Sequence, residues 1–162
     1  MSQSTKKALI ILTSHTELGS TGRKTGFYYD EMATPYWRLI DAGFDVDIAS
    51  VKGGIAPPDP KTLVEPNDRP PMVARFMSND KAMAKLNNSY VLKELNGETY
   101  ECVFLPGGHG TMWDFDTKDI GKIKSLQFTE IKDLVTYYQV SSKIEGISNN
   151  KIIYNISFNK EK

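Results

Sequence analysis

Residues 100–110 read YECVFLPGGHG, an apolar run that ends at Pro106 and is followed by three glycines and a histidine. A run of this kind is typical of a buried strand that stops abruptly. Glycines directly after a strand let the backbone approach a ligand, so that two N–H groups could stabilise an oxyanion. His109 could orient a substrate or carry a proton. The same residues also suit a tight strand-to-helix turn, and both interpretations stay open.

Two earlier segments have the pattern of strands. Residues 8–14, ALIILTS, form a mostly apolar run typical of a fully buried parallel strand. Residues 44–50, FDVDIAS, alternate as a half-buried strand does. Between them, Thr25 is expected to cap a helix over residues 26–41. Pro35 falls inside that span, which predicts a kink or a break in the helix.

The order of these segments predicts the fold class. Apolar residues spaced among charges over residues 71–95 indicate one or two short helices before the strand at 100–105. Strand, helix, strand, helix, strand at this spacing predicts a right-handed, parallel α/β sheet. Ligands on such sheets bind at the carboxyl ends of the strands, where the loops after Ser14, Ser50 and Leu105 emerge.

Composition limits the class of protein further. The chain has 162 residues, 40% of them hydrophobic, which suits one globular domain. Its one cysteine, Cys102, excludes an internal disulfide framework and a multi-cysteine metal site. The formal net charge of +0 gives no argument for a nucleic-acid partner, and the apolar run near the N-terminus is too short to span a membrane. A soluble, cytoplasmic protein is therefore expected.

The composition changes near residue 120. Residues 1–120 carry 13 basic and 16 acidic side chains, whereas residues 121–162 carry 7 and 4 and contain no Ala, Pro, Arg or Met. Such a change can mark a domain boundary, a tail, or a chain that no longer follows its ancestral pattern. We therefore divide the chain into residues 1–120 and a divergent tail, 121–162. The tail is expected to hold a helix through about Tyr138 and a strand near residues 152–158.

Glu31 and Cys102 are two further side chains of residues 1–120 that could take part in chemistry. Glu31 falls in the first turns of the expected helix, where a carboxylate favourably meets the helix dipole. Alternatively it lies inside the cleft above the first strand, where partial burial would raise its pKa and suit it to acid–base chemistry. Cys102 is expected inside a central strand, as a protonated core residue rather than a nucleophile.

Together these residues resemble the ThiJ/PfpI superfamily, the class I glutamine amidotransferase-like fold, and within it the heat-shock chaperone and glyoxalase III branch. The resemblance covers about residues 6–120 and implies a flavodoxin-like, three-layer α/β sandwich with a parallel sheet whose C-terminal part is truncated or divergent here. Four stretches carry it: residues 7–14, 24–35, 42–50 and 100–114.

The resemblance also implies roles for single residues. Glu31 would be the acidic residue beside the nucleophile, Gly107 and Gly108 would line the oxyanion pocket, and His109 matches a histidine that binds a metal in some relatives. The companion metal ligand has no match in residues 24–31, so no metal or cofactor is expected. Enzymes of this branch convert methylglyoxal-type 2-oxoaldehydes to 2-hydroxy acids without glutathione. Deglycase and chaperone roles are also ascribed to them, and they commonly form homodimers.

The departure from the family pattern concerns the nucleophile. The family places a cysteine on an A-V-C-H-G elbow one helix and one strand after the glycine loop, but this sequence has no cysteine after Cys102 and no histidine after His109. Ser141 is the nearest positional counterpart, and a serine without a base is a poor nucleophile. We therefore predict an inactive, truncated or divergent relative. The alternatives are a non-catalytic chaperone-like or binding module, and an enzyme completed by a second chain.

Overall fold

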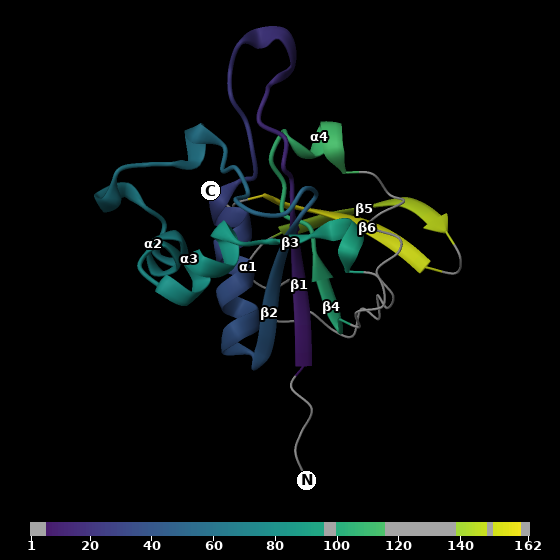
Figure 1. Ribbon diagram of the computed structural model, residues 1–162. Coiled ribbons are helices and arrows are strands. Elements are labelled where there is room, and N and C mark those ends of the chain that lie inside the picture. Colours follow the sequence, from purple (N-terminus) through teal and green to yellow (C-terminus); the bar gives the residue numbers. More distant parts are fainter. Residues whose placement is uncertain (1–5, 96–99, 116–138, 149–150, 160–162) are drawn as a thin grey trace.

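The computed structural model describes residues 6–95, 100–115, 139–148 and 151–159, the last two ranges by their backbone (Figure 1). A parallel sheet runs through the first part in the order β3-β2-β1-β4. Its strands are β1 (Lys6–Leu12), β2 (Phe44–Ser50), β3 (Tyr90–Val91) and β4 (Cys102–Phe104). The predicted α/β class with a parallel sheet is thus confirmed.

Helices cover one face of this sheet. α1 packs on β1 and β2, α3 packs on β2, and α2 packs on both helices, to one side of the strands in Figure 1. The helices are α1 (Tyr29–Asp41), α2 (Pro71–Met77), α3 (Asp80–Asn87) and the short α4 (Thr111–Asp114). None of the helices in the described ranges has the length and apolar character that crossing a membrane requires.

The strands contribute side chains to a core on each face, as their period of two requires. Ile10, Ile48 and Phe104 join the side chains of α1, α2 and α3 in one buried cluster. Leu9 and Ile11 point to the other face and pack with Tyr100 and residues of the segment after β3. β1 is buried on both faces, which explains its continuous apolar sequence.

α1 differs from the helix predicted over residues 26–41. It begins at Tyr29, and its N-cap Tyr28 makes no side-chain cap. Thr25 instead donates its hydroxyl to Asp59 at 3.0 Å, and the Phe27 N–H donates to the Pro57 carbonyl at 2.9 Å. Residues 25–27 therefore bind the 57–59 loop instead of forming the first turn of the predicted helix.

The remaining helix and strand predictions have mixed outcomes. The sequence predicts a kink or a break at Pro35; α1 continues through this residue without a break, and the kink stays a prediction. α2 and α3 confirm two short helices within residues 71–95, but the two-residue strand β3 was not predicted.

The tail contains two strands. β5 (Gln139–Ser148) and β6 (Lys151–Asn159) pair antiparallel with each other and form a separate sheet (Figure 1). Residues 152–158 are a strand as predicted, within β6, but neither tail strand pairs with the four-stranded parallel sheet. The helix predicted through about Tyr138 lies outside the described residues, and the division at residue 120 stays a prediction.

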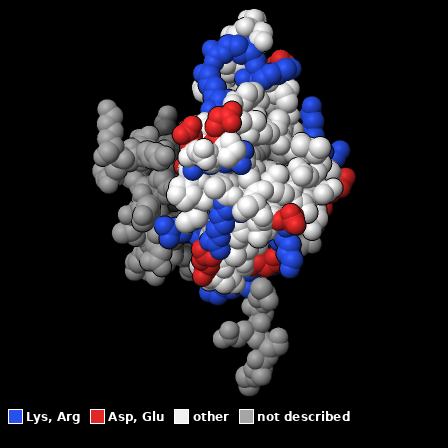
Figure 2. Space-filling view, turned by 90° about the vertical axis from the view of Figure 1, so that its left-hand side faces the viewer, with Lys and Arg blue, Asp and Glu red and all other residues white. Residues whose placement is uncertain are grey.

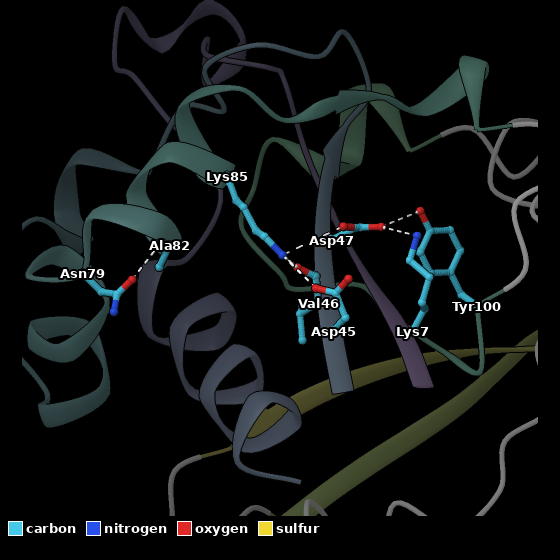
Figure 3. Close-up of polar contacts among 8 residues, drawn as sticks. All are labelled: Lys7, Asp45, Val46, Asp47, Asn79, Ala82, Lys85 and Tyr100. Atoms are coloured by element: carbon cyan, nitrogen blue, oxygen red, sulfur yellow. Dashed lines mark hydrogen bonds and ion pairs between the residues drawn. The ribbon is translucent and has the colours of Figure 1, made fainter. Parts of the chain in front are cut away.

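A polar network lies on the face of the sheet opposite α1, near the amino ends of the strands (Figure 3). We call this the second face. Asp47 is 7% exposed and accepts a hydrogen bond from the Tyr100 hydroxyl at 3.1 Å. The Lys7 ammonium lies 3.1 Å from the same carboxylate oxygen. Lys85 approaches the other oxygen at 4.0 Å and donates to the Val46 carbonyl at 2.6 Å. These contacts compensate the burial of the carboxylate.

Candidate functional site

The carboxyl ends of β1, β2 and β4 meet at one edge of the sheet because the strands are parallel and in register. Ile10 pairs with both Ile48 and Phe104. The segment after β1 and the glycine loop after β4 therefore emerge beside each other, as predicted. The segment from His15 to Lys24 stands out from the body (Figure 1) and forms the top of the space-filling view (Figure 2). Its basic residues are Arg23 and Lys24, and Lys24 pairs with Glu17.

The glycine loop packs against the start of α1. The Gly107 N–H donates to Glu31 Oε2 at 2.7 Å, and the Tyr28 N–H donates to the Gly107 carbonyl at 3.0 Å. Gly108 adopts φ of +127°, and a Cβ there would lie 2.2 Å from the Gly26 carbonyl oxygen. Only glycine fits so close an approach of two backbones.

Glu31 is partly buried at this junction, on the first turn of α1. Burial raises the pKa of its carboxyl, the Gly107 N–H opposes the shift, and the neighbouring Asp30 charge adds to it. Glu31 thus lies on the first turn of the helix, one of the two positions considered from the sequence, and its carboxyl faces the glycine loop; an acid–base role stays a prediction. The raised pKa suits a group that can exchange a proton.

The structure brings together three of the predicted site residues. Glu31, Gly107 and Gly108 lie at one junction. His109 is the next residue of the same loop and its side chain is exposed. Ser141 lies in β5 and pairs with Ser157 of β6; its side chain is outside the description, so its role as a nucleophile stays a prediction.

A second set of contacts fastens the glycine loop to the end of β1. Asp114, on α4, accepts hydrogen bonds from the Thr13 hydroxyl and from the Ser14 N–H, both at 2.7 Å. Thr13 is fully buried and also lies against Gly110, where a Cβ would be 2.7 Å from its hydroxyl oxygen. We refer to Thr13, Ser14 and Asp114 as the aspartate clasp.

Sequence reasoning missed the aspartate clasp. Asp114 is about a hundred residues from Thr13 and Ser14 in the sequence, and no short sequence motif links the two ends. The position of Asp114 four residues after the glycine loop was the one available signal. Trp113 beside it is 46% exposed and stacks on His15 with ring centroids 4.7 Å apart. Trp113 therefore packs at the surface, against the segment that follows β1.

The site residues do not form a metal centre within the described ranges. There, no group of three or more histidine, cysteine, aspartate or glutamate side chains could hold an ion. Cys102 lies in β4 with its side chain mostly buried, and burial raises the pKa of its thiol to about 11. A thiol with this pKa stays protonated at neutral pH, as predicted.

Comparison with known proteins identifies distant relatives of the chain. The chain is 30% identical over 125 residues to the glutathione-independent glyoxalase HSP31 of Saccharomyces cerevisiae, covering 74% of this chain and 52% of that protein. The chain is a distant, partial homologue of the glutathione-independent glyoxalases. This homology confirms the resemblance described from the sequence, although no family model matches the chain.

Solved structures support the same relationship. Glyoxalase III from Candida albicans superposes with a TM-score of 0.63 at 28% identity, over 73% of this chain and 50% of that one. The rapid encystment protein REP24 of Francisella tularensis gives a TM-score of 0.64 at 32% identity, over 73% and 53%. The chain therefore spans about half the length of the relatives it matches.

Proposed function

We propose that this chain keeps the carbonyl-binding part of a glyoxalase III-like site but does not itself convert 2-oxoaldehydes to 2-hydroxy acids. One observation carries the proposal: the sequence holds a single cysteine, and burial in β4 raises the pKa of that thiol to about 11. Covalent catalysis by a thiol requires the thiolate, and a protonated thiol in a strand cannot supply it.

The retained part is the junction of the glycine loop with α1. Backbone N–H groups after a strand can donate to a carbonyl oxygen or an oxyanion, which is the role the resemblance implies for Gly107 and Gly108. The Gly107 N–H donates to Glu31 in this structure, so a ligand oxygen would have to displace that carboxylate. Glu31 adds a carboxyl with a raised pKa beside them. These groups can orient a small carbonyl compound, but none of them forms the covalent bond to carbon that the relatives' chemistry would need.

The direct test is turnover of methylglyoxal by the purified chain, followed as D-lactate formation. We expect no D-lactate above the buffer control. Turnover that disappears in Glu31→Gln would overturn the proposal, because it would show a working site that uses this carboxyl. Cys102→Ser is the matched control: turnover that depended on Cys102 would show that the buried thiol is activated after all.

The same protein preparation tests the alternatives from the sequence. Suppressed aggregation of a heated client protein, without D-lactate formation, would favour a chaperone-like module over a plain inactive relative. D-lactate formation that required addition of a second polypeptide would favour a two-chain enzyme. Location in the cytoplasm and a homodimeric state stay predictions, and the elution volume of the purified chain on size-exclusion chromatography tests the latter.

A further inference from the structure

The carboxylate of Glu31 occupies a backbone donor that a ligand oxygen would need. The Gly107 N–H points at Glu31 Oε2 across 2.7 Å, and the Gly107 carbonyl accepts from the Tyr28 N–H at 3.0 Å. Both polar backbone groups of Gly107 are thus engaged by the start of α1. We propose that Glu31 is a built-in competitor that fills the Gly107 donor and excludes small carboxylates from the glycine loop.

The geometry around Gly107 holds this contact in place. A Cβ on Gly107 would lie 2.5 Å from Glu31 Oε2, so the carboxylate sits directly against the backbone. Gly108 is fixed by its φ of +127° and by the Gly26–Tyr28 backbone behind it. The loop therefore cannot retreat from Glu31 without breaking its backbone contact to α1, and a ligand must displace the side chain instead.

Charge decides which ligands are excluded most strongly. A hydrogen bond from an N–H to a carboxylate is about twice as strong as one to a neutral oxygen. A ligand that carries a carboxylate has to displace Glu31 from the Gly107 N–H, and it is also repelled by the negative charge of Glu31. This repulsion is strong because charges in a partly buried setting are poorly screened. A neutral carbonyl meets only the competitor. Among the described residues the Gly108 N–H donates to no acceptor, and we assign it as the second donor to a ligand oxygen.

Ligand binding at the two glycine amides tests the inference. D-lactate is the anionic probe and hydroxyacetone the neutral one, each titrated into ¹⁵N-labelled chain while the Gly107 and Gly108 amide signals are followed. In the wild type we expect D-lactate to leave the Gly107 amide unmoved. In Glu31→Ala we expect both amides to shift and D-lactate affinity to rise at least about tenfold, with a smaller rise for hydroxyacetone.

Asp30→Asn is the matched control, because it removes one negative charge from the adjacent residue. Asp30 accepts from the Thr34 hydroxyl at 2.8 Å. We expect Asp30→Asn to change D-lactate affinity less than twofold. An equal gain in Asp30→Asn and Glu31→Ala would overturn the inference, since net charge alone would then explain it. A wild-type Gly107 amide that responds as strongly as in Glu31→Ala would also overturn it.

Glu31→Gln guards against misfolding of the alanine variant, because it keeps the side-chain volume while removing the charge. We expect it to give an intermediate gain in D-lactate affinity. The choice of D-lactate as probe rests on the proposed function, but the amide shifts of Gly107 and Gly108 can be measured whether or not that function is correct. Turnover of methylglyoxal would overturn the proposed function and leave the amide titration informative, whereas unchanged affinity in both Glu31 variants would overturn only this inference.

Discussion

Gly108 shows how one residue can fix the position of the candidate site. Its φ of +127° suits glycine, and an added Cβ would meet the Gly26 carbonyl oxygen at 2.2 Å and Phe27 Cα at 2.7 Å. Backbone atoms cannot move aside as a flexible side chain can. We therefore expect Gly108→Ala to lower the free energy of unfolding by at least about 3 kcal/mol, measured by urea denaturation.

Gly22→Ala separates backbone strain from this collision. Gly22 also has a positive φ, of +70°, but an added Cβ there meets nothing within 4 Å. We expect a loss of about 1 kcal/mol from strain alone. Equal losses in the two variants would show that close packing of the glycine loop on α1 contributes nothing.

Glu31 makes stability depend on pH. Its folded pKa is raised above the unfolded value, mainly by burial, so the folded state binds the proton more tightly than the unfolded state does. The resulting stabilisation is fully present below the ordinary glutamate pKa and is lost as pH rises through the raised value. We expect the stability of the wild type relative to Glu31→Gln to fall across that window. A carboxyl ¹³C titration should give a midpoint above the ordinary one; a depressed midpoint would contradict the prediction.

At the scale of elements, the start of α1 shows where sequence reasoning succeeds and where it stops. The helix itself is present and ends at Asp41 as expected. Its beginning does not, because Thr25 and Phe27 bind the 57–59 loop, thirty residues away. Local capping rules cannot anticipate a competing tertiary partner. The sequence indicates Glu31 as a candidate site residue. Its contact with Gly107 could not be predicted, because it depends on how the glycine loop packs against α1.

The aspartate clasp gives a prediction for α4. Asp114→Asn removes the charge that receives two hydrogen bonds at 2.7 Å from the end of β1. Hydrogen bonds to charged groups contribute more than neutral ones, so we expect a loss of about 2 kcal/mol in the free energy of unfolding. Amide hydrogen exchange should accelerate at residues 110–114 while the β1 and β2 amides stay protected.

Asp41→Asn is the control for the aspartate clasp. Asp41 also receives two hydrogen bonds, at 2.8 and 2.9 Å from Arg75, but it does so at the surface. Surface ion pairs contribute little, and we expect a loss below about 1 kcal/mol. If Asp41→Asn proved as costly as Asp114→Asn, burial at the aspartate clasp would not be the reason for its strength.

At the scale of the whole molecule, burial explains which strands the sequence revealed. β1 is buried on both faces, and its unbroken apolar run predicts a central parallel strand. β3 has two residues, one of them exposed, and leaves no periodic signal. The strand near residues 152–158 was visible from its alternation, but its antiparallel pairing with β5 was not, because pairing depends on register between segments rather than on either segment alone.

The two ends of the parallel sheet can be perturbed separately. Asp47 lies on the same face of the sheet as Tyr100 and Lys7 (Figure 3). Within the described part of the chain, none of the hydrogen bonds and ion pairs of its side chain involves the glycine loop. Asp47→Ala would leave the buried Tyr100 hydroxyl without this acceptor and remove the carboxylate between two ammonium groups, so we expect a loss of about 3 kcal/mol by urea denaturation. Asp45→Ala, two residues earlier and exposed, loses one 3.1 Å contact with Lys85 and should cost less than about 1 kcal/mol.

Combining Asp47→Ala with Gly108→Ala tests that separation. Sites without shared partners have additive effects on the free energy of unfolding, to within about 0.5 kcal/mol. We expect the double variant to show the sum of the two losses, and Asp47→Ala alone to leave the Gly107 and Gly108 amide signals in place. Coupling beyond that margin would mean that the charged network and the glycine loop communicate through β1 and β2. In that case the polar face would belong to the functional site rather than only to the scaffold beneath it.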